Sequence, residues 1–157
     1  MRFTLRKTVV TRDLAAEDAS VLAKLHAGAF HRGWSEDEFE RLLASSTSLG
    51  EGAAFSESGL LQGFVLSRLA KVEAEILSIV IDPSARRQGV GRALFAKHLE
   101  RLRNLGVREL FLEVEETNRA AIAFYQGFGF RNVGRREAYY QRGTSAPAAA
   151  LVQRCDL

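Results

Sequence analysis

One short segment of this chain combines glycines with arginines, directly after an apolar run and at the start of an amphipathic pattern. It consists of Arg86, Arg87, Gln88, Gly89, Val90, Gly91 and Arg92. Glycines let backbone N–H groups approach a ligand, and the first turn of a helix leaves N–H groups unpaired at its positive end. The arginines add full positive charges. The segment therefore predicts a cradle for a pyrophosphate, as in an enzyme that uses a phosphate-bearing cofactor.

Neither of the two common nucleotide-binding patterns is present. The third glycine of G-x-G-x-x-G is replaced by Leu94, and G-x-x-x-x-G-K-[ST] does not occur. A short G-x-G by itself is equally consistent with a glycine-containing helix start and solvated arginines. The rest of the chain has to decide between the two interpretations.

The apolar residues around this segment predict alternating strands and helices. We expect strands at 3–10, 53–56, 60–68, 72–81 and 108–114, a strand through Val133 and a last one at 148–155, with helices at 15–30, from Ser35, at 86–105 and at 118–127. Residues 45–52 are polar and small, which is typical of a loop. This order predicts an α/β fold in one domain, 1–157, with a mixed central sheet of about six to seven strands flanked by about four helices.

Two of these helices have clear end signals. Ser35 with Glu38 matches a capping box at the start of the helix whose buried face would include Phe39. Gly106 stands where a glycine commonly ends a helix. The buried face of the helix at 86–105 is expected to consist of Leu94, Phe95, Leu99, Leu102 and Leu105.

Composition limits the classes of function. The net charge of +3 and the pI near 9.3 are too weakly basic to indicate a direct nucleic-acid role. No apolar run is long enough for a membrane span, and the first residues lack the apolar core of a signal peptide. Cys155 cannot form an internal disulfide, and its spacing from the histidines predicts no metal site. We expect a cytoplasmic protein, as a monomer or weak dimer.

The motifs resemble a known family. Arg86-x-x-Gly89-x-Gly91 is similar to the R/Q-x-x-G-x-G/A motif of the GCN5-related N-acetyltransferases (GNAT), and Asn118 followed by A-A-I-A-F-Y and G-F-G-F is similar to that family's second cofactor motif. The resemblance spans most of residues 60–141. It implies the GNAT fold, with acetyl-coenzyme A as co-substrate and no metal. It also implies that the segment 86–92 holds the pyrophosphate, that Ile79, Val80 and Ile81 run beside the pantetheine arm, and that Asn118 contacts the cofactor.

Within the family, the chain looks most like the bacterial ribosomal-protein alanine N-acetyltransferases (RimI-like). His26-x-x-x-Phe30, the segment Trp34 to Phe39, Leu112-Glu113-Val114 and the pair Tyr139-Tyr140 carry this likeness. It implies Glu113 as general base, Tyr125 as general acid, and the N-terminal alanine of ribosomal protein S18 as substrate. Trp34 and Tyr139 are candidates for binding the substrate peptide. Relatives often carry an acidic residue before the last strand, where this chain has A-P-A-A-A.

Each of these residues also has a purely structural interpretation. Glu113 could be a strand carboxylate paired with an arginine, and Tyr125 a core aromatic. Asn118 could simply cap a helix, Trp34 could pack before the second helix, and Tyr139 could be a packing residue.

The chemistry fits a free α-amine. Such an amine has a pKa of about 7.7–8.0, against about 10.4 for lysine, so a carboxylate can remove its proton far more easily near neutral pH. The sequence thus predicts acetyl transfer from acetyl-coenzyme A to a protein N-terminus. Two alternatives remain open: a GNAT enzyme acting on lysine side chains or small amines, and a non-catalytic module that binds acetyl-coenzyme A. The arginines from Arg131 to Arg142 keep the second alternative open, because they could form a basic docking patch.

Overall fold

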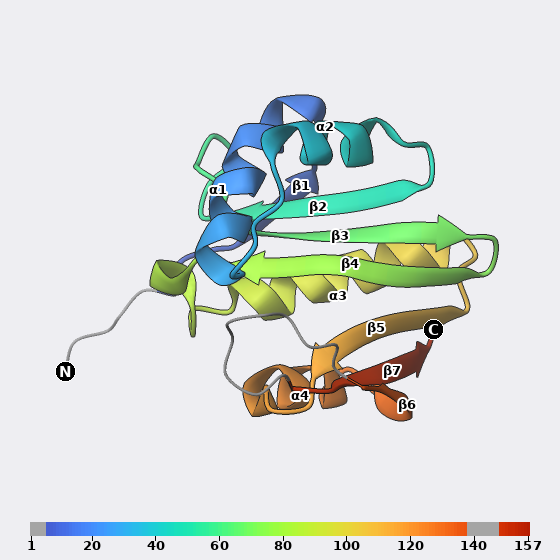
Figure 1. Cartoon of the computed structure of the whole chain (residues 1–157). Coiled ribbons are helices and arrows are strands. Elements are labelled where there is room, and N and C mark those ends of the chain that lie inside the picture. Colours follow the sequence, from blue (N-terminus) through green and yellow to red (C-terminus); the bar gives the residue numbers. More distant parts are fainter. Residues whose placement is uncertain (1–5, 138–147) are drawn as a thin grey trace.

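The computed structural model describes residues 6–137 and 148–157, which form a seven-stranded sheet with the strand order β1-β2-β3-β4-β5-β7-β6 (Figure 1). The elements in chain order are β1 (Val10–Asp13), η1 (Ala16–Asp18), α1 (Ala19–Ala29), α2 (Glu36–Ala44), β2 (Ser48–Ala54), β3 (Gly63–Ala70), β4 (Glu73–Ile81), η2 (Pro83–Ala85), α3 (Val90–Asn104), β5 (Glu109–Glu115), α4 (Arg119–Gln126), β6 (Arg131–Arg136) and β7 (Ala150–Asp156). β4 and β5 pair in parallel, and the other strand pairs are antiparallel. The predicted α/β class, strand number and element order are confirmed.

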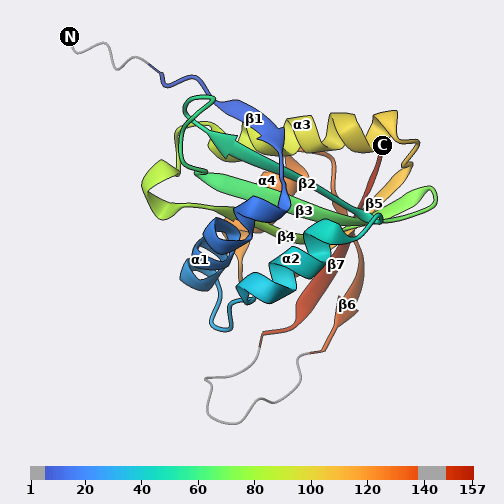
Figure 2. The same cartoon turned by 90° about the horizontal axis from the view of Figure 1, so that it is seen from above.

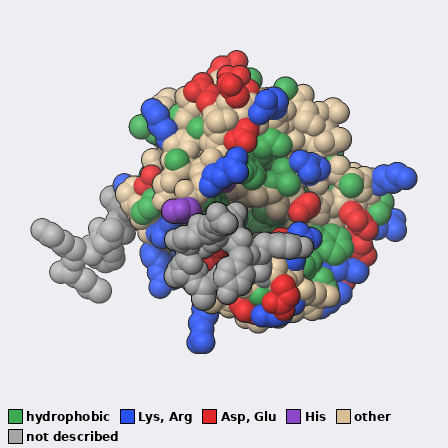
Figure 3. Space-filling view, viewed as in Figure 1, with side chains coloured by type: hydrophobic (Ala, Val, Ile, Leu, Met, Phe, Trp, Pro, Cys, Tyr) green, Lys and Arg blue, Asp and Glu red, His purple; other side chains and the backbone are tan. Residues whose placement is uncertain are grey.

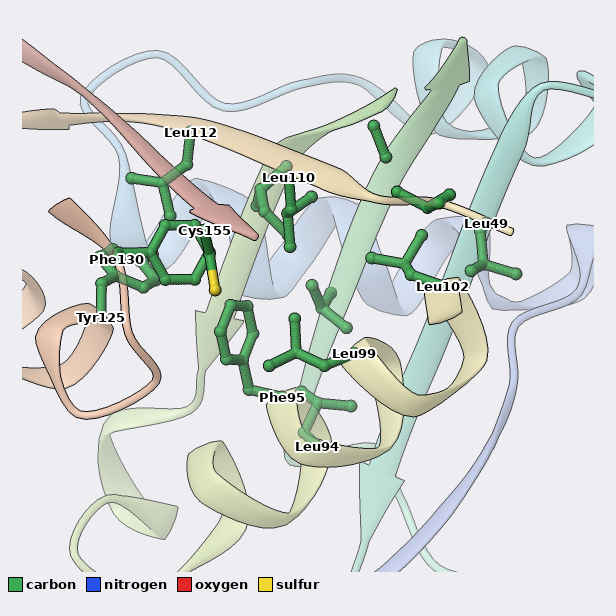
Figure 4. Packing of buried hydrophobic residues seen from close by; sticks show 14 of the residues in the cluster. Leu49, Leu94, Phe95, Leu99, Leu102, Leu110, Leu112, Tyr125, Phe130 and Cys155 are labelled. Atoms are coloured by element: carbon green, nitrogen blue, oxygen red, sulfur yellow. The ribbon is translucent and has the colours of Figure 1, made fainter. Parts of the chain in front are cut away.

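Helices cover both faces of the sheet (Figures 1 and 2). α1 and α2 lie on one face, over a cluster that includes Leu22, Phe39 and Phe64. α3 and α4 lie on the other face, over a larger cluster that includes Phe95 and Leu110 (Figure 4). The sheet therefore separates two hydrophobic cores, each sealed by a pair of helices.

The predicted bounds of the first two strands were wrong. β1 begins only at Val10, and β2 begins at Ser48, so residues 48–52 of the expected loop at 45–52 belong to this strand. The glycines of this segment were interpreted as loop residues, but they make room for neighbouring side chains. A Cβ on Gly50 would lie 2.9 Å from Leu14 Cδ1, and one on Gly52 only 2.6 Å from Leu61 Cδ2. Glycines that make room for neighbouring leucines are indistinguishable by composition from loop glycines.

The main helix was also predicted too long. α3 begins at Val90 rather than at residue 86, because Arg87 and Gly89 adopt positive φ angles of 63° and 83°. Leu105 is 56% exposed rather than buried, since it is the C-cap residue and the chain turns away at Gly106, with a φ angle of 84°. The capping box of α2 and the C-terminal glycine of α3 are both as predicted.

A bulge in β4 lies just beyond the point where the sheet splits. β3 residues Leu66 and Ser67 pair with Ser78 and Ile76, so Leu77 is an extra residue on β4. β4 and β5 pair only from Glu73–Glu109 to Glu75–Phe111. Beyond that point the two strands diverge (Figure 1), and no described strand pairs with β4 on this side from Ile76 to its end. We call this break in the strand pairing, between the carboxyl ends of β4 and β5, the opening between β4 and β5.

Candidate active site

The predicted cradle is a strained turn that leads from β4 into α3. Asp82 ends β4 and accepts hydrogen bonds from the Ser84 backbone N–H (2.9 Å) and hydroxyl. The Gln88 side chain donates to the Ser84 carbonyl oxygen at 2.8 Å and closes the turn from the other end. Positive φ angles at Arg87 and Gly89 then reverse the chain into the helix. Arginine is uncommon in this backbone region, so the surrounding contacts must hold the turn.

This backbone leaves a run of unused N–H groups. Among the described residues, none of the N–H groups from Arg87 to Arg92 donates a hydrogen bond, and the first helical bond runs from Ala93 N–H to the Gly89 carbonyl at 3.1 Å. We call these six N–H groups the cradle. They lie at the positive end of α3, and the side chains of Arg86, Arg87 and Arg92 are exposed beside them. The arrangement fits a pyrophosphate, as predicted.

The opening between β4 and β5 lies at the cradle end of the sheet, because β4 leads directly into the turn. Ile79, Val80 and Ile81 form the last part of β4, and their main chain pairs with β3 on one side only. The other main-chain edge is free of strand partners within the described residues. An extended ligand arm held by the cradle could pair with this edge. Figure 3 shows hydrophobic side chains gathered in a hollow near the middle of the face that carries α1 and α2.

Glu113 lies on β5 and projects from the face opposite to its neighbours. Leu112 and Val114 are buried in the α3/α4 core, whereas the Glu113 side chain is 37% exposed on the α1/α2 side. Arg136 on β6 reaches it, with Nη2 3.1 Å from the carboxylate oxygen Oε1. Strand alternation directs this carboxylate away from the α3/α4 core. The pairing with an arginine, which the sequence left as an alternative, is present.

Tyr125 lies on the other side of the sheet from Glu113. Its ring is buried in the α3/α4 core between Phe95 and Phe130, with ring centroids 5.8 and 5.7 Å away (Figure 4). Burial raises the pKa of the Tyr125 hydroxyl to about 12, so the group keeps its proton at neutral pH. Because the sheet separates the two side chains, a ligand could meet both only by passing through the opening between β4 and β5.

Asn118 follows β5 and caps α4. Its Oδ1 accepts a hydrogen bond from the Ala121 N–H at 3.1 Å, so the capping interpretation is correct. The side chain is exposed, and a further contact with a ligand is compatible with this geometry.

The chain is similar to known acetyltransferases. The sequence model described as "Acetyltransferase (GNAT) family" matches residues 19–130. The chain belongs to this acetyltransferase family. It is 34% identical over 110 residues to the [ribosomal protein bS18]-alanine N-acetyltransferase of Escherichia coli K12, which covers 68% of this chain and 70% of that protein. It is 37% identical over 134 residues to the N-alpha-acetyltransferase RimI of Mycobacterium tuberculosis, covering 82% of each chain.

The fold agrees with the same relationship. The crystal structure of the ribosomal-protein-S18-alanine N-acetyltransferase from Escherichia coli superposes with a TM-score of 0.85 at 28% identity, over 95% of this chain and 94% of that one. The predicted GNAT fold, the likeness to the RimI-like enzymes and the assignment as an acetyl-coenzyme A-dependent N-acetyltransferase are confirmed.

In this acetyltransferase, Trp34 packs as a staple ahead of α2. It precedes the N-cap Ser35, and its ring lies 4.5 Å from the His26 ring and 5.5 Å from that of Phe39. Its backbone N–H donates to His26 Nδ1 at 3.0 Å. The half-buried ring leaves part of its surface open to solvent, so the packing interpretation holds and a peptide contact is still possible. Tyr139, the other candidate for peptide binding, lies outside the described residues.

Carboxylates at the carboxyl end of β5 pair with arginines of β6 across the intervening strand β7. We call Glu113, Glu115 and Glu116 the acidic edge. Arg135 donates to Glu116 through Nε (3.0 Å) and Nη2 (3.1 Å), and these hydrogen bonds lower the pKa of the Glu116 carboxyl. Arg131 pairs with Asp156. Among the described residues, the arginines of β6 therefore neutralise nearby carboxylates rather than forming the basic patch that the sequence suggested.

A buried polar cluster was missed in the sequence. His98 on α3 contacts Glu51 on β2 and Ser67 on β3, and all three are buried. The signal was present, because His98 stands four residues from both Leu94 and Leu102 and so shares their buried helix face. No group of three or more potential metal-ligating side chains is found within residues 6–137 and 148–157. Over the same residues, no helix is both long and apolar enough to cross a membrane.

Proposed function

We propose that this acetyltransferase transfers an acetyl group from acetyl-coenzyme A to the free α-amine of a protein N-terminus, and that its substrate is the N-terminal alanine of ribosomal protein S18. The observation that carries the proposal is the likeness to relatives with this named activity, at 34% identity over two thirds of the chain. The cradle and the opening support it, because they offer one path for a long, phosphate-bearing cofactor. We further propose a cytoplasmic enzyme of one domain, 1–157, acting as a monomer or weak dimer.

Different residues would bind different parts of acetyl-coenzyme A. The cradle N–H groups would hold the pyrophosphate, with Arg86, Arg87 and Arg92 adding charge. The free main-chain edge at Ile79 to Ile81 would hydrogen-bond the pantetheine arm, and Asn118 would contact the cofactor from the start of α4. An N–H near Val80 or Ile81 would then polarise the thioester carbonyl.

The reactive groups would act from the two faces of the sheet. Acetyl-coenzyme A supplies a thioester, which an amine can attack directly without a covalent enzyme intermediate. Glu113 would take the proton from the attacking α-amine, directly or through a water molecule. Tyr125 would donate its proton to the departing sulfur, and its raised pKa ensures that this proton is present. A thioester held in the opening between β4 and β5 would meet Glu113 from one side and Tyr125 from the other.

The peptide would lie on the α1/α2 face, next to Glu113. Trp34 and Tyr139 are the proposed contacts for its first residues. Glu115, which is exposed at the end of β5, would hold the positive charge of the N-terminus before its proton is removed. Glu116 is less suited to this task, because Arg135 already satisfies its carboxylate.

Release of coenzyme A from acetyl-coenzyme A tests the proposal against a matched set of peptides. The set contains an S18-like peptide with a free N-terminal alanine, the same peptide with a blocked N-terminus, and the blocked peptide with one lysine. We expect turnover with the free α-amine alone. Turnover with the lysine peptide alone would place the enzyme among the lysine-directed acetyltransferases. Cofactor binding without turnover on any peptide would contradict the proposed substrate.

A further inference from the structure

A chain of polar contacts runs through the core beneath α3. Because the Glu51 carboxylate can only accept, His98 Nδ1–H donates to its Oε2, while His98 Nε2 lies 2.5 Å from the Ser67 hydroxyl oxygen. Arg101, one helical turn after His98, donates to Glu51 Oε1 and also pairs with Asp13 on β1 at 2.7 Å. We call Glu51, Ser67 and His98 the buried relay. Through Arg101 and Asp13 it ties α3 to β1, β2 and β3.

The order of residues in the buried relay is that of a hydrolase triad, but it cannot act as one. Ser67 and His98 are 0% exposed and Glu51 is 1% exposed. A nucleophile needs access to its substrate, and none of these atoms has it. The relay must therefore act through the structure around it.

Its position connects the two parts of the cofactor path. Ser67 stands at the shift in the β3–β4 register, opposite Ile76, where the paired part of β4 and β5 has just ended. His98 stands in the middle of α3, whose first turn forms the cradle about 12 Å away at 1.5 Å per residue. The His98 imidazole thus connects the point where the pairing of β4 and β5 ends to the helix that carries the cradle.

We propose that the buried relay is a positioning device for cofactor binding: it fixes the translation and rotation of α3 against the bulged step of the sheet, so that the cradle stays in line with the opening between β4 and β5. This inference rests on the proposed cofactor path. Apolar packing alone tolerates small slides of a helix over leucines, whereas directed hydrogen bonds to Glu51 and Ser67 fix the register of α3. The relay consists of positioning residues, since none of its atoms reaches the cofactor.

The test separates positioning from stability. His98→Leu leaves a buried carboxylate and hydroxyl without their imidazole partner, so it should lower the melting temperature as well as cofactor affinity. The triple variant Glu51→Met, Ser67→Ala, His98→Leu removes all three buried polar groups together, and replacement of such a cluster by apolar residues is often neutral for stability. Arg101 keeps Asp13 as its partner in this variant. Lys97→Ala, on the exposed side of the same helix turn, is the matched control.

Calorimetric titration with coenzyme A gives the decisive readout. We expect the triple variant to melt near the wild-type temperature and to bind coenzyme A about tenfold more weakly, as expected for a small displacement of a distant binding group. Lys97→Ala should match the wild type in both. Wild-type affinity in a stably folded triple variant would overturn the inference. Failure of the wild type itself to bind coenzyme A would instead overturn the proposed function.

A measurement on the wild-type protein covers the case in which the triple variant does not fold. The chain has three histidines, so the side-chain imidazole N–H signal of His98 can be assigned by nuclear magnetic resonance from His26→Gln and His31→Gln. We expect coenzyme A to change the chemical shift of this buried N–H, because a ligand bound at the first turn of α3 should alter the hydrogen bonds that His98 makes from the same helix. An unchanged His98 signal at saturating coenzyme A would refute the positioning role.

Discussion

The cradle and the acidic edge are built from different chemical groups. The cradle consists of main-chain N–H groups, whose directions follow from the backbone angles at Arg87 and Gly89. The acidic edge consists of carboxylates, and two of them are held by arginines from β6. A main-chain site is defined once the fold forms, whereas a side-chain site also depends on which partners the fold brings near. We therefore expect cofactor binding and acetyl transfer to respond to different substitutions.

The largest effect should come from Glu113→Gln. If the carboxylate takes the proton from the amine, its loss should lower kcat/KM by about 100-fold, the lower range for a positioned general base. Affinity for coenzyme A should stay unchanged, because Glu113 lies on the α1/α2 face and away from the cradle. Steady-state kinetics with the free-alanine peptide, together with calorimetric titration of coenzyme A, measure both quantities.

Arg136→Gln is the matched control for this variant. It removes the same ion pair but keeps the carboxylate, and exposed ion pairs contribute little to stability. We expect its kcat/KM to stay within about threefold of the wild type. Equal losses in the two variants would mean that Glu113 serves only as the partner of Arg136.

Tyr125→Phe should have the next largest effect. We expect kcat to fall by about tenfold while the melting temperature stays the same, because phenylalanine fits the aromatic surroundings of Phe95 and Phe130. Since the pKa of Tyr125 is raised to about 12, the hydroxyl stays protonated up to about pH 10 and should produce no alkaline decline below that. Full activity in Tyr125→Phe would assign this tyrosine to the core alone.

Gly89→Ala should weaken cofactor binding and leave catalysis at saturation almost unchanged. Alanine in the left-handed region costs roughly 1–2 kcal/mol, and relief of this strain would turn the cradle N–H groups away from the ligand. We expect affinity for coenzyme A to fall by about tenfold. The effect belongs to the main-chain site, so kcat with the alanine peptide should stay within about twofold.

The same helix supplies the control. Gly106 at the other end of α3 has a φ angle of 84°, against 83° at Gly89, and a Cβ at either glycine would meet no atom within 4 Å. Gly106→Ala should therefore lose similar stability in thermal unfolding but bind coenzyme A like the wild type. Equal loss of affinity in both variants would assign the effect to helix stability rather than to the cradle.

The difference between the two regions also explains what could be predicted from the sequence. The cradle, the α3 helix and the Asn118 cap were predictable, because glycine spacing, helix periodicity and capping are local signals. The strand at Ser48–Ala54 was not, since Gly50 and Gly52 acquire their role only from Leu14 and Leu61 across the sheet. The turn that forms the cradle could thus be located from local sequence, whereas its assignment to a pyrophosphate also needed the family resemblance.

The acidic edge could be predicted only in part. Glu113 was identified through family resemblance, but its exposure follows from strand alternation together with the helices on each face. Its partner Arg136 lies 23 positions later along the chain, and β7 stands between their two strands. Such pairings depend on strand order, which local patterns do not reveal. The buried relay was missed for the same reason, because Glu51 and His98 meet only in the folded sheet.

The smallest expected effect is a pH dependence of the free energy of unfolding that arises on the α1/α2 face. His26 is stacked between Phe30 and Trp34 at 4.4 and 4.5 Å, and burial lowers its pKa from the ordinary 6.5. As pH falls below 6.5, the unfolded chain takes up this proton before the folded protein does, so the free energy of unfolding should decrease until the lower folded pKa is passed. Urea unfolding between pH 7 and pH 5 measures the decrease.

His26→Gln should flatten this dependence, and His31→Gln, in the exposed connection after α1, should leave it unchanged. Carboxylates with lowered pKa values, such as Asp18 and Glu38, stabilise the fold above their ordinary pKa values of 3.8 and 4.5 and lose that effect only at lower pH. These carboxylates therefore do not account for a decrease in the free energy of unfolding between pH 7 and pH 5. A slope in His26→Gln equal to that of the wild type would mean that the α1/α2 face owes its acid sensitivity to another group, whereas a flattened slope would locate that sensitivity at the stack beside the proposed peptide site.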